Sequence, residues 1–167
     1  MTKVMRWLQY ASERVDRVAI YISIVYAFLV TVLVLGSVFL RMAGNAPTWS
    51  EELARWLLVG IAFISSSVAL KRGSHIGITV LVKSIPFKLP VKIIILLSNV
   101  LVLIFLAFMF WFGLDAAIKA ADQSGDIIPI SVIYVKLHIP LGAMMMAIHV
   151  LYCTVGIFTN EDPKIFL

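Results

Sequence analysis

Uncharged, mostly apolar residues are gathered into long blocks along this chain. Three of these blocks, 18–40, 93–114 and 137–160, are each long enough to form a membrane span. A helix needs about 20 apolar residues, at roughly 1.5 Å rise each, to cross the hydrocarbon core of a membrane. A fourth block, 56–70, reaches that length only when its helix begins near Thr48. The pattern predicts four spans, near 18–40, 49–71, 92–114 and 137–159.

The first residues of the chain show a different pattern. Apolar side chains recur there at helical spacing, with basic residues alongside them, as in a helix that lies at a membrane surface; the apolar positions are Val4, Trp7, Leu8, Ala11 and Val15. We therefore expect an all-α membrane protein, a bundle of four transmembrane helices plus an N-terminal amphipathic interfacial helix. Residues 1–167 then form a single integral membrane domain.

Two apolar segments need separate treatment because of their length. The block 18–40 is longer than the apolar region of a cleaved signal peptide, which is about 7 to 15 residues, so we expect it to be a retained helix. The segment 75–86 is too short to span and lies between Gly73 and Pro86. It is expected to be a short interfacial or re-entrant piece.

The overall composition agrees with a membrane protein. Hydrophobic residues make up 62% of the chain and charged residues 14%, where a soluble domain has about one quarter charged residues. Cys153 is the only cysteine, so an internal disulfide and a thiolate metal cluster are both excluded. The net charge of +5 comes from basic residues beside the apolar spans and does not indicate nucleic-acid binding.

The basic residues are distributed unequally between the predicted loops. Ten of the 14 lie on one side of the membrane, in the N-terminus, the loop after the second span and the C-terminus. The positive-inside rule then places both termini and the middle loop in the cytoplasm. The connection 115–136 faces outward, and we expect it to extend the third helix and turn at residues 124–126.

The stretch TWSEELARW, residues 48–56, brings charges to the start of the second span. One interpretation is structural: Thr48 and Glu51 have the spacing of a capping box, and Glu52 can pair with Arg55 three residues on. Trp49 and Trp56 suit the aromatic belt at the membrane interface.

A second interpretation of the same stretch is a contact surface. Trp49, Glu52 and Trp56 share one helical stripe, with Arg55 beside it, about one and a half turns into the span. A charge at that depth usually faces protein rather than lipid. The stripe is therefore a candidate docking surface for another membrane protein.

These motifs resemble a known family. WSEELAR at 49–55, followed by KRGSHI at 71–76, resembles the small membrane subunit of tripartite ATP-independent periplasmic (TRAP) transporters. The run IYVKLHIPLG at 133–142 is similar to the start of that family's last span. The matching residues are Trp49, Glu51, Glu52, Arg55, Arg72, Gly73, His75 and Ile76.

The resemblance implies a role in which this chain catalyses no reaction. In the family a soluble periplasmic protein captures an organic anion, such as a carboxylate or sialic acid, and a large membrane subunit carries substrate and sodium. The small subunit pairs with the large one and braces it as a scaffold. We therefore expect three kinds of partner, a large multi-span transport subunit, a transient periplasmic binding protein and lipids, with no catalytic residue, cofactor or metal. The short tail, 161–167, leads us to expect the large partner as a separate chain.

The histidines keep an alternative from another class open. His138 and His149 share one face of the fourth span, and axial histidines ligate haem in helical bundles, so a membrane anchor of a redox enzyme is the rival interpretation. The other interpretation makes His149 a buried contact and His138 an ordinary hydrogen-bonding residue. Arg72 and His75 form either a cytoplasmic helix end or a partner contact.

A stand-alone small transporter is the third alternative. Such proteins build their sites near the membrane midplane from repeated halves, and 18–71 shares no motif with 92–159. The spans also carry few ionisable residues. The sequence therefore favours a scaffold over a solute path.

Overall fold

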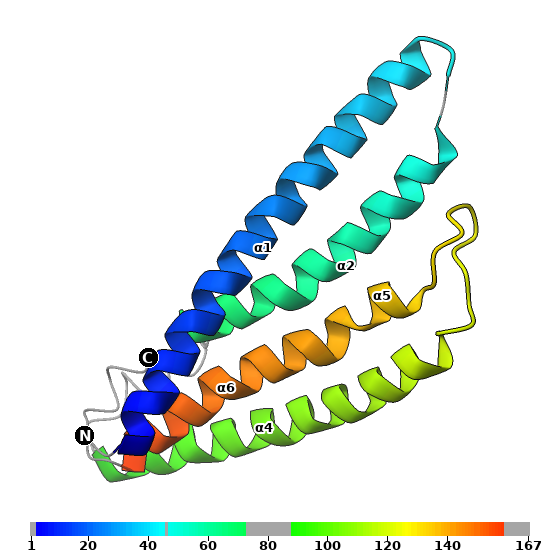
Figure 1. Ribbon diagram of the computed structural model, residues 1–167. Helices are drawn as coiled ribbons and strands as arrows, with labels where there is room; N and C mark the ends of the chain where they lie inside the picture. The colour runs from blue at the N-terminus through cyan, green and yellow to red at the C-terminus, as the bar shows by residue number, and fades with distance from the viewer. Residues whose placement is uncertain (1–2, 46, 73–87, 159–167) are drawn as a thin grey trace.

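The computed structural model describes residues 3–45, 47–72 and 88–158, which are helical over most of their length and contain no strand (Figure 1). Four helical segments are long and apolar enough to cross a membrane, as predicted. The expected interfacial piece at 75–86, with His75, lies outside the described residues. The helices are α1 (Lys3–Met42), α2 (Thr48–Lys71), α4 (Lys88–Lys119), α5 (Ile133–Lys136) and α6 (His138–Phe158).

The first helix, α1, is longer than its predicted span. The interfacial helix expected ahead of the span is the first part of α1 rather than a separate element. No glycine or proline occurs between residues 3 and 35, so nothing interrupts the backbone hydrogen bonds. The buried residues of α1, Met5, Ser12 and Ala19, are seven apart and face the protein.

The end of α1 is set by a glycine. Gly44 has a φ of +83°, a conformation that other residues adopt only with strain. Its N–H donates to the Arg41 carbonyl at 3.1 Å, and the N–H of Asn45 donates to the Leu40 carbonyl at 2.9 Å. This pair of bonds is a Schellman motif, which satisfies carbonyls that the helix end would otherwise leave unpaired.

The four long segments form a row rather than a closed bundle. α1 packs on α2 and also contacts α6, α2 packs on α6, and α6 packs on α4, so α2 and α6 are central. The helices converge at the end that holds residues 3, 71, 88 and 158, and they spread apart at the other end (Figure 1). We call these the inner and outer ends, which the basic residues predict to be cytoplasmic and outward-facing.

Small residues allow the central helices to approach closely. Leu106 of α4 and Ala143, Met146 and Val150 of α6 form a buried apolar cluster. A Cβ atom added at Gly142 would lie 2.8 Å from the backbone oxygen of Phe63 on α2. Close packing through small residues is the usual mode of helix association in membranes.

This contact generates a stability prediction. We expect Gly142→Ala to destabilise the protein by about 1–3 kcal/mol, because the new methyl group meets α2 backbone that cannot move alone. Thermal unfolding of the purified chain in detergent measures the change. Gly36→Ala on α1 is the matched control, since its Cβ would meet nothing within 4 Å. Equal melting temperatures for the two variants would contradict the packing argument.

Candidate functional site

The start of α2 does not form the predicted capping box. Pro47 is the N-cap residue, and no side chain makes a capping hydrogen bond to the helix. Thr48 is already the first helical residue, so its hydroxyl lies one position too late to act as the cap. Instead the Ser50 hydroxyl donates to the Pro47 carbonyl at 2.7 Å.

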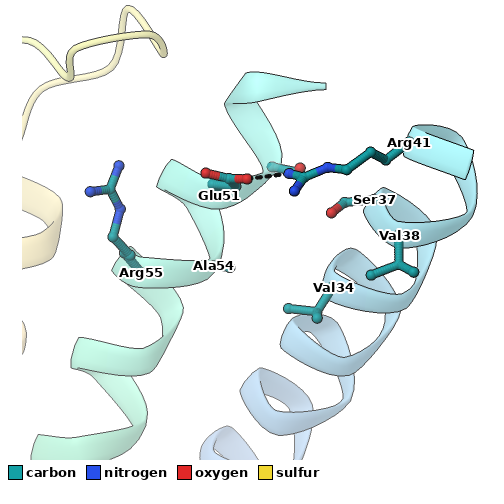
Figure 2. Close-up of a pocket in the computed structure, with 8 residues that line it drawn as sticks. Val34, Ser37, Val38, Arg41, Glu51, Ala54 and Arg55 are labelled. Atoms are coloured by element: carbon teal, nitrogen blue, oxygen red, sulfur yellow. Dashed lines mark hydrogen bonds and ion pairs between the residues drawn. The ribbon is translucent and has the colours of Figure 1, made fainter. Parts of the chain in front are cut away.

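Glu51 points to another helix. Its carboxylate accepts a hydrogen bond from the Arg41 guanidinium, in the last turn of α1, and this ion pair bridges the outer ends of the two helices (Figure 2). Both side chains are largely exposed, 62% for Arg41 and 60% for Glu51. Exposed ion pairs contribute little stability. This pair is of interest because it joins the outer ends of two helices.

Glu52 is the buried carboxylate of the site, with 4% of its surface exposed. Its partner is not Arg55 as predicted: both residues are described and no ion pair joins them. Oε1 accepts from the N–H of Asp126 at 2.8 Å, and Oε2 accepts from the N–H groups of Ile127 and Ile128 at 2.9 and 2.8 Å. Successive backbone N–H groups that converge in this way form a nest, which binds an anion.

The nest belongs to the connection between α4 and α5, residues 120–132. Ser124 and Ser131 form an isolated antiparallel bridge, and the Ser131 hydroxyl donates to the Ala121 carbonyl at 2.7 Å. α4 continues past the predicted span before this connection, as expected. The connection turns sharply enough that the N–H groups of 126–128 point to α2.

Trp56 completes the contact with this connection. A Cβ atom added at Gly125 would lie 2.6 Å from a Glu52 oxygen and 2.8 Å from the Trp56 ring, so both side chains lie against Gly125. Trp49 and Arg55 remain exposed. The predicted stripe is thus divided: Glu52 and Trp56 face the chain's own connection, while Trp49 and Arg55 face outward.

A second polar cluster joins α1, α2 and α6 toward the inner end. His149 of α6 is 1% exposed, and its Nδ1 shares a hydrogen bond of 2.8 Å with the Ser12 hydroxyl of α1. The Lys71 ammonium of α2 donates to the Ser12 carbonyl at 3.2 Å and lies 3.6 Å from the Asp16 carboxylate. Arg72 lies 3.9 Å from the same carboxylate and is 61% exposed.

His138 also has a partner on α1. Its Nε2 lies 3.1 Å from the Tyr26 hydroxyl, and its Nδ1 lies 3.0 Å from the Val135 carbonyl. Both ring nitrogens are therefore occupied within the chain. No group of three or more His, Cys, Asp or Glu residues that could hold a metal ion occurs in the described ranges.

Several of these residues were not predicted as site residues. These residues contact others that are far away in the chain; they are Ser12, Asp16, Tyr26 and Lys71. Asp16 could have been singled out from the sequence, because it is an acidic residue among basic residues close to the first span.

Comparison with known proteins relates this chain to a transporter family and to a protein of known name. The model of the family described as "Tripartite ATP-independent periplasmic transporters, DctQ component" matches residues 30–160. The sialic acid TRAP transporter small permease protein SiaQ of Vibrio cholerae serotype O1 is 29% identical over 103 residues. That match covers 61% of this chain and 59% of the relative, less than two thirds of its length.

The Glu52 nest predicts how the outer connection responds to a single substitution. Glu52→Gln places an N–H₂ group against backbone donors, so we expect amide exchange at 126–128 to accelerate about tenfold or more. Hydrogen–deuterium exchange with mass spectrometry measures the rate. Glu51→Gln is the neighbouring control, since Glu51 contacts Arg41 and not the connection. Unchanged exchange in Glu52→Gln would show that the nest does not hold the connection.

The inner cluster predicts a loss of stability. Ser12→Ala removes the partner of the buried His149 Nδ1, which should cost about 1–3 kcal/mol. The melting temperature in detergent reports this loss. Ser66→Ala serves as control, because the exposed Ser66 hydroxyl bonds only within its own helix, to the Ala62 carbonyl. If both variants melt like the parent protein, the Ser12–His149 bond is not a stabilising contact.

Proposed function

Because this chain belongs to the family of DctQ components of TRAP transporters, we propose that it pairs with a large multi-span membrane subunit and braces it. The chain is a transport component and not an enzyme, and it is a multi-pass protein of the inner membrane. In the proposed role it serves the sodium-coupled uptake of an organic anion. Both termini face the cytoplasm in this proposal, as the basic residues predict.

One observation supports pairing above the others: the central helix α2 has an open face. Exposed residues recur along it at spacings of three and four, which places them on one stripe; they are Thr48, Glu51, Arg55, Leu58, Ala62, Ser66, Ala69 and Arg72. Neighbouring helices cover the other faces of α2, on one side α1 and on the other α6. The broad side of the row therefore carries an uncovered strip along its middle.

The composition of this strip fits protein better than lipid. Ala62, Ser66 and Ala69 are small, and small residues are enriched where helices associate closely in membranes. Arg55 stands at the start of the span, where a cation usually faces protein or water. Arg55 and Trp49 are the site residues we assign to partner contact, with Arg72 at the inner end. Glu52, Trp56 and His149 are assigned to fixing this chain's own helices.

The outer connection supports a second, transient contact. Ile127 and Ile130 are about half exposed in a segment outside the long helices, and the Glu52 nest holds that segment in place. Apolar side chains on a fixed, exposed segment suit a soluble partner. We propose that the periplasmic substrate-binding protein touches this connection.

The substrate belongs to the other subunits in this proposal. The name of the Vibrio cholerae relative specifies sialic acid, a carboxylate-bearing sugar, for that protein. We propose an organic acid as substrate here, selected by the binding protein and the large subunit. The redox-anchor alternative is disfavoured by the occupied nitrogens of His138 and by the family.

Pairing through the open face of α2 can be tested with matched variants. We expect Arg55→Ala and Leu58→Trp each to lower the yield of co-purified large subunit about tenfold, because each changes a side chain in the proposed interface. The tagged chain is solubilised from its own membranes in mild detergent, and mass spectrometry quantifies the partner.

Leu101→Trp is the control for this experiment. Leu101 on α4 is 59% exposed and Leu58 is 51% exposed, so the two substitutions are alike in size and exposure. Normal pairing in Arg55→Ala and Leu58→Trp, or equal loss in Leu101→Trp, would refute the proposed interface. A chain that purifies without any large membrane partner would refute the role itself.

A further inference from the structure

Helices α1 and α2 diverge toward their outer ends (Figure 1). A cavity of about 470 Å³ lies between them there (Figure 2). Ligand sites in proteins are commonly about 300–1,000 Å³, so this space is large enough for part of a small amphiphile. Its walls come from the last two to three turns of α1 and the first two turns of α2. The residues that line it are Val34, Ser37, Val38, Arg41, Ser50, Glu51, Ala54 and Arg55.

The two ends of the cavity differ in chemistry. Val34, Val38 and Ala54 line the part toward the middle of the membrane, while Arg41 and Glu51 form its rim (Figure 2). The Arg55 guanidinium points away from α1 and does not join this rim (Figure 2). An apolar floor with a charged rim is complementary to a molecule that has an apolar chain and a charged head.

The rim carries one charge of each sign, and each has bonding capacity left. Arg41 has five N–H donors in a planar fork, and the Glu51 carboxylate has about four acceptor positions. A single bond joins the two side chains. The remaining donors can bind a phosphate, and the remaining acceptors can bind an ammonium group.

The environment of the cavity points to one occupant. Arg41 lies in the last turn of α1 and Glu51 in the first turn of α2, so the rim is at the depth where lipid head groups lie. Space between helices that diverge inside hydrocarbon is filled by acyl chains, since water gains no hydrogen bonds against Val34 and Val38.

We propose that this cavity binds one zwitterionic glycerophospholipid whose head is phosphoethanolamine. The phosphate lies on Arg41, the ammonium group lies on Glu51, and the upper part of an acyl chain lies against Val34, Val38 and Ala54. The Ser37 hydroxyl, which points into the space below the ion pair, donates to the phosphate or to an ester carbonyl (Figure 2). The cavity shares Glu51 and Arg55 with the strip proposed for the large subunit, but its α1 wall, with Arg41, lies outside that strip. Lipid binding here does not depend on that assignment.

The head group makes the site selective. Phosphatidylglycerol has the same phosphate and the same chains but no ammonium group. Glu51 then faces neutral glycerol hydroxyls instead of an ammonium group, and the phosphate charge is not compensated within the head group. Selection between two lipids that differ in one charge is a difference in affinity, which a titration measures directly.

Native mass spectrometry of the full chain tests the proposal. The purified protein, delipidated in mild detergent, is titrated with dioleoyl phosphatidylethanolamine or dioleoyl phosphatidylglycerol, and bound lipids are counted. We expect one phosphatidylethanolamine to bind in preference, and Arg41→Gln to weaken it about tenfold. Glu51→Gln should remove the preference between the two lipids. Val38→Phe, which fills the floor, should weaken both.

Lys119→Gln is the control, because Lys119 forms the exposed pair with Asp115 at the outer end of α4 and does not line the cavity. Unchanged binding in Arg41→Gln, an unchanged preference in Glu51→Gln, or equal loss in Lys119→Gln would overturn the proposal. A photocrosslinking residue at position 38 of the native complex gives an independent readout. A lipid adduct supports the site, whereas an adduct to the large subunit assigns the cavity to a protein segment and overturns it.

Discussion

The Glu52 carboxylate is almost fully buried, and its two oxygens need hydrogen-bond donors that α2 itself does not supply. Three successive N–H groups of the outer connection meet that need, at 2.8 to 2.9 Å. A buried charge without such donors is costly, so the position of the connection and the position of α2 depend on each other. α5 and α6 follow directly after the connection, which means that this one carboxylate links α2 to the second half of the chain.

The row of helices fits the bracing role that we propose for this small protein. The central helix α2 has α1 and α6 as neighbours, and the row leaves one of its faces uncovered. In a membrane that face can accept another helix through its small residues, Ala62, Ser66 and Ala69. The two edge helices, α1 and α4, present large apolar side chains such as Phe28 and Phe105 to their surroundings.

The inner and outer ends of the row are held in different ways. Toward the inner end, Ser12, Lys71 and His149 tie three helices together through buried or half-buried polar contacts. At the outer end α1 touches α2 through the exposed Arg41–Glu51 pair, and a cavity remains below it. The helices are thus tied together by more buried polar contacts at the convergent end, and the divergent end is where the proposed lipid has room to enter.

The sequence by itself determined the number and the type of the candidate spans, because hydropathy is a local property of the chain. It also carried the family motif, in which Trp49, Glu52 and Arg55 stand at fixed spacing. Predictions from local spacing were wrong where they assigned a partner nearby in the sequence and the actual partner is distant. Glu52 binds residues 74 to 76 positions away rather than Arg55, and Glu51 binds Arg41 rather than its own helix start.

Only the tertiary structure decided the contacts of His149 and Ser12, which are 137 residues apart, and the arrangement of the helices in a row. Hydrophobic periodicity says that a helix lies in a membrane. It does not say which helix covers each face, since lipid and apolar protein surface are equally compatible with leucine, valine and phenylalanine. That choice rests on close approaches such as Gly142 against Phe63 and on buried polar groups that must find donors, and both exist only once the helices are packed.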